Sequence, residues 1–133
     1  MLELKKSPIS LTLQLIGKKW TTEIITDLMS GRKRFSDLLD SNPDISSKML
    51  SERLKELYNE GFIDKIIINM IPLRVKYQIT SKGKLLNRVL YEMAIFGSLV
   101  YPQEVFNTPP KEKSTIIQWF ADLFGIDETQ PET

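Results

Sequence analysis

The chain contains no cysteine and no histidine among its 133 residues. The absence of cysteine excludes disulfides, thiol nucleophiles and thiolate metal ligands. The absence of histidine excludes imidazole ligands and the side chain most used for acid–base chemistry near neutral pH. An enzyme would have to rely on carboxylates, lysine, hydroxyls or tyrosine, and the acidic residues are scattered along amphipathic segments. The sequence therefore predicts no catalytic site, no metal site and no cofactor.

Long hydrophobic runs are also lacking. No stretch approaches the roughly 20 apolar residues of a membrane-spanning helix, and the first ten residues have no apolar run typical of a signal peptide. With 41% hydrophobic and 26% charged residues, the composition is ordinary for a soluble domain. We therefore expect a cytoplasmic protein with no membrane partner.

The net charge is only +1, but the charge is unevenly distributed along the chain. Residues 64–100 hold six Lys or Arg against two acids, a net charge of +4. Residues 101–133 hold two Lys against six acids, a net charge of −4. A basic body favours attraction to a polyanion more than the total charge suggests.

The spacing of apolar residues predicts four helices in the N-terminal part of the chain. The expected segments are residues 8–16, 18–30, 35–42 and 46–60. Pro43 must end the third segment by the preceding residue, and Gly61 lies just after the fourth. Ser46 is expected to cap the fourth segment with its hydroxyl.

The pattern then changes from helical to alternating. Residues 62–69 and 75–79 have the composition of strands, and the short connector containing Pro72 predicts an antiparallel hairpin. Thr80 is expected to cap one long helix that continues to about Val100.

The segment 46–60 combines an apolar face with an outer face of small and cationic residues. Leu50, Leu54 and Leu57 fall on one side, where we expect them to face the core. Short side chains let a helix approach base edges, and cations neutralise phosphate or reach guanine. The candidate DNA contacts are Ser46, Ser47, Lys48, Ser51, Arg53 and Lys55. The alternative is a plain solvated face, with the cations paired to neighbouring glutamates.

The order of the elements is typical of a winged helix-turn-helix protein that binds double-stranded DNA. Two short helices precede the segment 46–60, and the hairpin follows it directly. Arg74 and Lys76 lie at the hairpin tip, where a wing contacts the backbone or enters the minor groove. Arg32, Lys33 and Arg34 are candidate phosphate contacts, and the alternative is that they favour a helix C-terminus electrostatically.

An apolar stripe with heptad spacing runs along the predicted long helix. It consists of Leu86, Val89, Met93, Phe96 and Val100. Helices with this spacing pair with one another, so we predict a homodimer interface. Burial of the stripe within one subunit is the alternative.

Four runs of sequence together resemble the HxlR-type, MarR-like winged-helix transcriptional regulators: PISLTLQLIGKKW, GRKRFSDLL, ISSKMLSERLKELYNEGFI and IPLRVKYQITSKG. The resemblance covers about residues 7–100. It implies a homodimer on an inverted-repeat operator, with the first helix, which carries Leu11, and the long helix at the interface. It also implies that the helix at 46–60 reads DNA and that residues 72–77 form the wing.

The chain departs from this family at one position. Members often carry a cysteine directly before the proline of the opening segment, and some of them sense electrophiles or oxidants through it. Here that residue is Ser7. Thiol sensing is therefore excluded, and a small-molecule effector would have to act in another way.

We therefore expect a mainly α protein with a small β-hairpin wing, an α+β winged helix-turn-helix fold with a long C-terminal dimerisation helix. Residues 1–101 are expected to form the DNA-binding and dimerisation domain. Residues 102–133 are expected to hold a linker, an amphipathic helix over 113–124 and an acidic tail. This last helix is open to three interpretations: a dimer clasp, packing within the subunit, or a lid over an effector site. The alternative function is a winged helix that binds protein or RNA.

Overall fold

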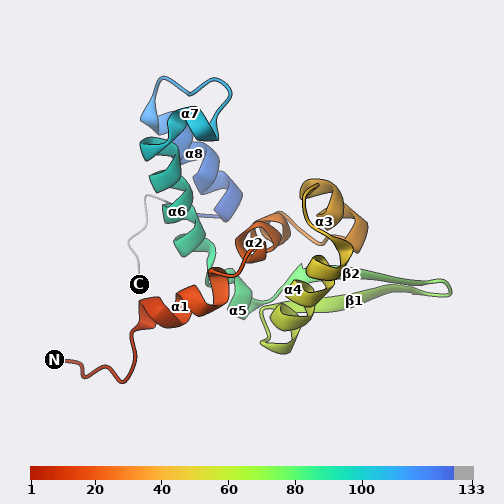
Figure 1. The fold of residues 1–133 in the computed structure, drawn as a ribbon. Coiled ribbons are helices and arrows are strands. Elements are labelled where there is room, and N and C mark those ends of the chain that lie inside the picture. Colours follow the sequence, from red (N-terminus) through yellow and green to blue (C-terminus); the bar gives the residue numbers. More distant parts are fainter. Residues whose placement is uncertain (128–133) are drawn as a thin grey trace.

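The computed structural model describes residues 1–127, and it shows a mainly helical protein with one β-hairpin (Figure 1). Residues 128–133, the end of the expected acidic tail, lie outside the described residues. The elements of the N-terminal half are α1 (Pro8–Ile16), α2 (Thr21–Met29), α3 (Phe35–Ser41) and α4 (Ser47–Asn59). The elements that follow are β1 (Ile63–Met70), β2 (Leu73–Ile79), α5 (Ser81–Lys84), α6 (Asn87–Val100), α7 (Pro102–Val105) and α8 (Lys113–Phe124).

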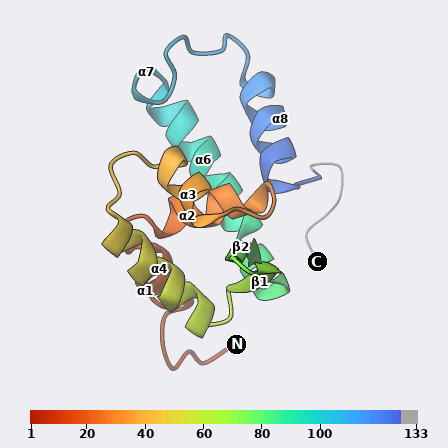
Figure 2. The same ribbon diagram turned by 90° about the vertical axis from the view of Figure 1, so that its right-hand side faces the viewer.

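These elements form a helix-turn-helix body from which the hairpin projects (Figure 1). Viewed along the hairpin, α4 lies beside the two strands, and α6 and α8 stand above the body (Figure 2). The body is held by apolar side chains that are almost fully buried, namely Ile24, Ile25, Leu28, Leu38, Leu50, Leu54, Leu57 and Ile63. The predicted winged-helix α+β class is confirmed.

The second helix begins later than its apolar spacing predicts. The predicted segment was 18–30, but α2 begins at Thr21 because Trp20 takes a left-handed backbone conformation with φ of 78°. Residues 18–20 therefore form a turn between α1 and α2. The side chain of Trp20 is partly buried against the core, which is the packing role that tryptophan usually has.

The predicted long helix from Thr80 to Val100 is wrong, because the structure breaks it in two. Thr80 does cap a helix by accepting a hydrogen bond from the Gly83 N–H at 3.1 Å, but this helix, α5, has four residues. Gly83 packs so closely against the hairpin base that a Cβ would lie 2.3 Å from the Phe62 carbonyl oxygen. The chain then turns at Leu85 and Leu86 and starts α6 in a new direction.

Helix α8 packs against both α6 and α2. Ile116, Ala121 and Phe124 are buried, and the Asn87 side-chain amide donates to the Phe124 carbonyl oxygen at 3.1 Å. Of the three interpretations of this helix, the structure shows packing within the subunit. The ring of Trp119 points outward and is 62% exposed.

Candidate nucleic-acid interface

Helix α4 has the two faces that its sequence predicts. Ser46 caps it by accepting a hydrogen bond from the Met49 N–H at 3.0 Å. Leu50, Leu54 and Leu57 are at most 2% exposed, so they anchor the helix in the core as expected. The side chains left on the outside include those of Ser46, Ser47, Lys48, Ser51 and Lys55, all of which are exposed. The structure therefore brings five of the six candidate contacts on this helix to one surface.

Arg53 is the exception, because its guanidinium group is used inside the subunit. Its Nε donates to the Lys19 carbonyl oxygen at 2.9 Å, and Nη1 pairs with Glu56 at 3.2 Å. The side chain of Arg53 is only 14% exposed. Arg53 ties α4 to the turn before α2, and its guanidinium group is already paired within the subunit.

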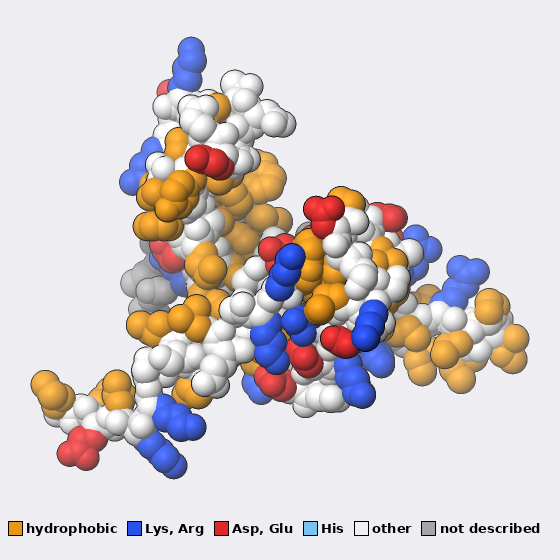
Figure 3. Space-filling view, in the orientation of Figure 1, with side chains coloured by type: hydrophobic (Ala, Val, Ile, Leu, Met, Phe, Trp, Pro, Cys, Tyr) orange, Lys and Arg blue, Asp and Glu red, His pale blue; other side chains and the backbone are white. Residues whose placement is uncertain are grey.

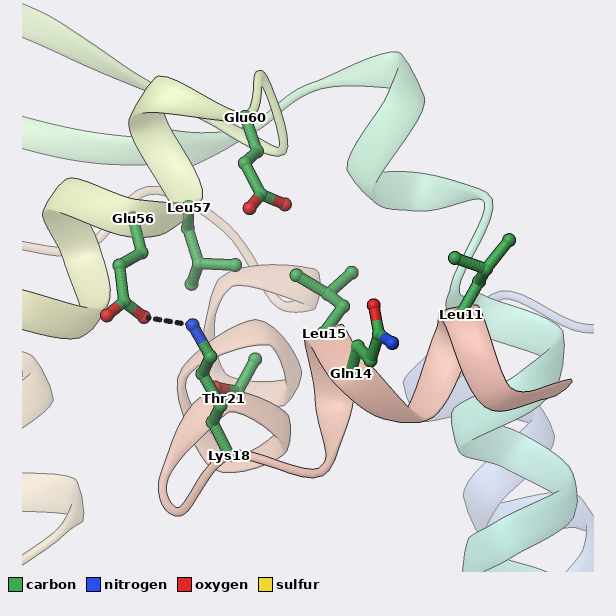
Figure 4. Close-up of a pocket in the computed structure, with 8 residues that line it drawn as sticks. All are labelled: Leu11, Gln14, Leu15, Lys18, Thr21, Glu56, Leu57 and Glu60. Atoms are coloured by element: carbon green, nitrogen blue, oxygen red, sulfur yellow. Dashed lines mark hydrogen bonds and ion pairs between the residues drawn. The ribbon is translucent and has the colours of Figure 1, made fainter. Parts of the chain in front are cut away.

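A second tie joins the same turn to α4. The Lys18 ammonium lies 3.4 Å from Glu56, and this pair stands at the edge of a cavity of about 430 Å³ between α1, α2 and α4 (Figure 4). Leu15 and Leu57 form part of its wall. Lys18, Lys19 and Arg53 thus fix the position of α4 relative to the N-terminal helices.

The hairpin and α4 flank one groove. The groove has a volume of about 370 Å³, and the charged residues that line it within residues 1–127 are Lys55 from α4 and Lys65 from β1. Lys65 was missed by sequence reasoning, which assigned no role to β1. The strand register reveals it, because Lys65 pairs with Tyr77 and so shares the face that turns toward α4. Its ammonium lies 5.2 Å from the centre of the Tyr58 ring.

The two cations predicted in the wing lie on the opposite face of the hairpin. Arg74 is exposed and Lys76 is half-buried. They alternate along β2 with Val75 and Tyr77, which belong to the face that carries Lys65. The hairpin therefore carries cations on both faces. Burial raises the pKa of the Tyr77 hydroxyl.

Two residues of the basic run at 32–34 contact the wing. Lys33 exchanges two backbone hydrogen bonds with Tyr77, at 3.0 and 2.7 Å. It thus forms an isolated antiparallel bridge on the open edge of β2. The Arg32 guanidinium donates to the Gln78 side chain. All three residues remain candidate phosphate contacts, because the Arg32 and Arg34 side chains are exposed and Lys33 is partly exposed.

Two polar contacts set the position of α3. The backbone N–H of Arg34 donates to Asp37 at 2.8 Å, and this bond and those from the Arg34 side chain lower the pKa of the Asp37 carboxyl. The buried amide of Asn42 donates to Asp27 at 3.0 Å, linking the end of α3 to α2. Burial raises the pKa of Asp27, and the bond from Asn42 opposes that rise.

The predicted dimer stripe is exposed on α6 with one exception. Val89, Met93, Phe96 and Val100 are 38–63% exposed, and Leu11 on α1 is 47% exposed. Leu86 is 8% exposed because the turn before α6 points it into the core of its own subunit. Leu86 therefore belongs to the interior rather than to the stripe. The remaining four residues, Val89, Met93, Phe96 and Val100, are called the α6 stripe.

Two classes of site are absent from the described part of the chain. Within residues 1–127, no helix is long and apolar enough to cross a membrane. The same residues contain no group of three or more acidic side chains placed to hold a metal ion.

Residues 15–105 match the model of the HxlR-like helix-turn-helix family. The chain belongs to this family. The HTH-type regulator YtcD of Bacillus subtilis is 37% identical over 99 residues, which are 73% of this chain and 79% of the relative. YodB of the same organism is 43% identical over 79 residues, covering 59% of this chain and 70% of the relative.

Solved structures agree with this assignment. The reduced form of the regulator YodB from B. subtilis gives a TM-score of 0.64 at 36% identity, covering 71% of this chain and 93% of that one. The redox regulator HypR in its reduced form gives a TM-score of 0.69 at 30% identity, covering 75% and 100%. The expectation of a winged helix-turn-helix transcriptional regulator, and not an enzyme, is confirmed.

Proposed function

We propose that the protein binds double-stranded DNA sequence-specifically as a homodimer and regulates transcription from an inverted-repeat operator. The observation that carries this proposal is the groove between α4 and the hairpin, which the cations Lys55 and Lys65 line. One side of the groove is a helix narrow enough for the major groove, which is about 12 Å wide. The other side is a projecting hairpin of the kind that contacts the neighbouring backbone or minor groove.

The roles of the residues follow from their positions. Ser46, Ser47, Lys48 and Ser51 lie at the N-terminal end of α4, the end that contacts base edges in helix-turn-helix proteins. Lys55, Lys65, Arg74 and Lys76 hold phosphates, which fixes the register but carries no sequence information. Arg53 acts within the subunit by orienting α4.

The α6 stripe and Leu11 form the dimer contact in this proposal. Four large apolar side chains on one helix face, 38–63% exposed, would be costly to leave in water. A two-fold axis beside α6 brings the stripes of two subunits together and sets two copies of α4 against successive major grooves. The half-sites would then be centred about 34 Å, or one helical turn, apart.

The signal that this regulator receives is not a thiol reaction. YodB has been solved in reduced and diamide-treated forms, and HypR is described as a redox regulator. This chain has no cysteine. Ser7 occupies the position before the opening proline, and its hydroxyl caps α1 by accepting a hydrogen bond from the Ser10 N–H at 3.2 Å.

Selection of bound sequences from a random duplex pool tests the proposal. We expect an inverted repeat to be enriched, with affinity that falls steeply as salt rises, because each neutralised phosphate releases about 0.9 of a counterion. A variant with both Lys48 and Ser51 changed to alanine should recover a different or degenerate half-site. No enrichment at low salt, or tighter binding to RNA than to any duplex, would refute the proposal.

A further inference from the structure

The tip of the hairpin is apolar and lies in water. Ile71 at its apex is 90% exposed, and Met70 and Leu73 on either side are 67% and 65% exposed. Ile67, two pairs further back, is 57% exposed. Figure 3 shows hydrophobic side chains gathered at the far end of the projecting hairpin, with Lys or Arg side chains beside them. These four residues are called the apolar tip.

The strand register sorts the tip into two faces. Met70 pairs with Leu73 and Ile67 pairs with Val75, so these side chains share the face that turns toward α4 near the body. Asn69 pairs with Arg74 on the other face, and the Asn69 amide donates to the Ile71 carbonyl oxygen at 3.4 Å across the turn. One face of the tip is therefore apolar, and the opposite face carries the polar Asn69 and the cationic Arg74.

The charge of the hairpin selects among possible partners for this tip. Within the hairpin, residues 63–79, the sequence contains three Lys or Arg and one acid, Asp64, which pairs with Gln78 at the end of the strands away from the tip. Apolar side chains beside cations fit a polyanion that also offers apolar surface. The faces of DNA bases offer such a surface beside the phosphates, and minor-groove proteins exploit it by inserting Ile, Met, Leu or Pro between base steps.

The reach of the hairpin favours the same partner. Tyr77 lines the groove beside α4, and Leu73 lies four strand residues further out, which is roughly 13 Å at 3.3 Å per residue. The next minor groove lies about 17 Å from the major groove, half of a helical turn of about 34 Å. Because Lys33 is bridged to Tyr77, the hairpin is held in this direction by the body.

We propose that the apolar tip enters the minor groove beside each half-site, partly unstacks a base step there and bends the duplex. Ile71 forms the wedge, Met70 and Leu73 cover the exposed base faces, and Arg74 holds the backbone. This inference rests on the proposed DNA-binding function and adds a mode of contact to it. Pyrimidine–purine steps unstack most easily, so the tip should favour them at positions that α4 does not touch.

The test uses the full chain and the duplex recovered by selection, about 30 base pairs long. Donor and acceptor dyes at its two ends report the bend by energy transfer, and 2-aminopurine at the flanking step reports unstacking. Wild-type protein should bend the duplex by roughly 20–90° and raise the 2-aminopurine fluorescence. Ile71→Ala should remove most of both signals and lower affinity by about tenfold, since most of the wedge area is lost.

Arg74→Ala is the matched control on the same hairpin. It removes a cation but keeps the apolar tip, so it should weaken binding while the bound duplex stays bent. The Ile71→Ala protein should keep the thermal unfolding midpoint of the wild type, because this side chain is 90% exposed. The double variant Met70→Ala/Leu73→Ala should lower the bend in the same way as Ile71→Ala.

The outcomes separate the two proposals. A wild-type complex with tight, selective binding but a straight, fully stacked duplex would overturn the wedge and leave the DNA-binding function intact. Equal bending by wild type and Ile71→Ala would overturn it as well. Vesicles containing phosphatidylserine provide the last comparison: if they bind wild type and not Ile71→Ala, and the DNA signals are absent, the tip serves a membrane surface instead. No binding to any duplex would remove both proposals.

Discussion

The α6 stripe and the apolar tip are both exposed hydrophobic surfaces, yet they differ in shape and in charge. Phe96 on α6 and Leu73 on the hairpin have nearly the same exposure, 63% and 65%. The stripe follows a helix of 14 residues whose neighbouring charges include both signs, as in the Arg88–Glu92 pair at 3.4 Å. The tip is the narrow end of a hairpin with three cations, and the one acid of the hairpin, Asp64, lies at its base.

This difference shows that exposed apolar area does not by itself identify a partner. A long apolar helix face with balanced charges is self-complementary, so a second copy can cover it across a two-fold axis. A narrow apolar point among cations is not self-complementary, because two copies would bring like charges together. It fits a partner that is both anionic and grooved.

Phe96→Glu should have the largest effect, and it tests whether the α6 stripe is the subunit contact. Two carboxylates would be buried near each other at an isologous contact, which costs about 3–5 kcal/mol and raises the dimer dissociation constant by roughly two to four decades. Sedimentation should then give the 15.4 kDa monomer where the wild type gives twice that mass.

Ile71→Glu is the matched control for that prediction. It introduces the same charge at an apolar site that is more exposed, 90% against 63%, and it should leave the dimer unchanged while weakening DNA binding by repelling phosphates. If the wild type is monomeric at micromolar concentration, or if Phe96→Glu still dimerises, the stripe is not the subunit contact.

A second, smaller effect concerns DNA binding. It distinguishes the contacts made by α4 from those made by the hairpin. Lys48→Ala should change which base pairs are preferred, with a loss of about 1–3 kcal/mol at the affected position. Arg74→Ala should weaken binding to all duplexes alike and reduce the salt slope by about one unit. Binding-site selections on both variants at two salt concentrations provide the measurement. Should both variants behave like the wild type, the placement of reader and wing is incorrect.

The smallest effect lies outside both surfaces and concerns the hydrogen bond between Arg34 and Asp37 at the start of α3. The lowered pKa of Asp37 means that its charged form stabilises the fold at pH values above its unfolded value, near 3.8. This stabilisation is lost as the pH falls through the folded pKa. The wild type should therefore be slightly more stable than Asp37→Asn at pH 6, and the two should converge in acid. Urea unfolding at the two pH values would show this, and a constant difference would contradict it.

Much of the helical framework could be predicted because it depends on local pattern. The bounds of α1 and α8 agree with the expected 8–16 and 113–124, and Ser46 caps α4 as its position suggests. The break in the expected long helix could not be predicted. Residues 80–100 are compatible with one continuous helix, and the break at Leu85 and Leu86 follows a short helix whose Gly83 packs closely against Phe62 and Ile79.

The candidate site was predicted less completely than the fold. Arg53 lies between the buried and the exposed faces of α4, and the position of the Lys19 carbonyl oxygen, which accepts its hydrogen bond, cannot be read from the sequence. Leu86 has the heptad spacing of the stripe, but it precedes α6 and points inward. Lys65 was missed because one strand alone does not reveal which of its faces turns toward α4.

The sequence by itself determined the types of the elements, the leucine face of α4, the apolar character of α6 and the absence of any thiol. These properties follow from residue identity and from periodicity along a single segment. Tertiary structure decided that Arg53 supports α4, that Leu86 is interior, and that Lys55 and Lys65 meet across one groove. These outcomes depend on the strand register and on the angles at which helices pack. Both are determined by contacts between side chains that lie far apart in the chain.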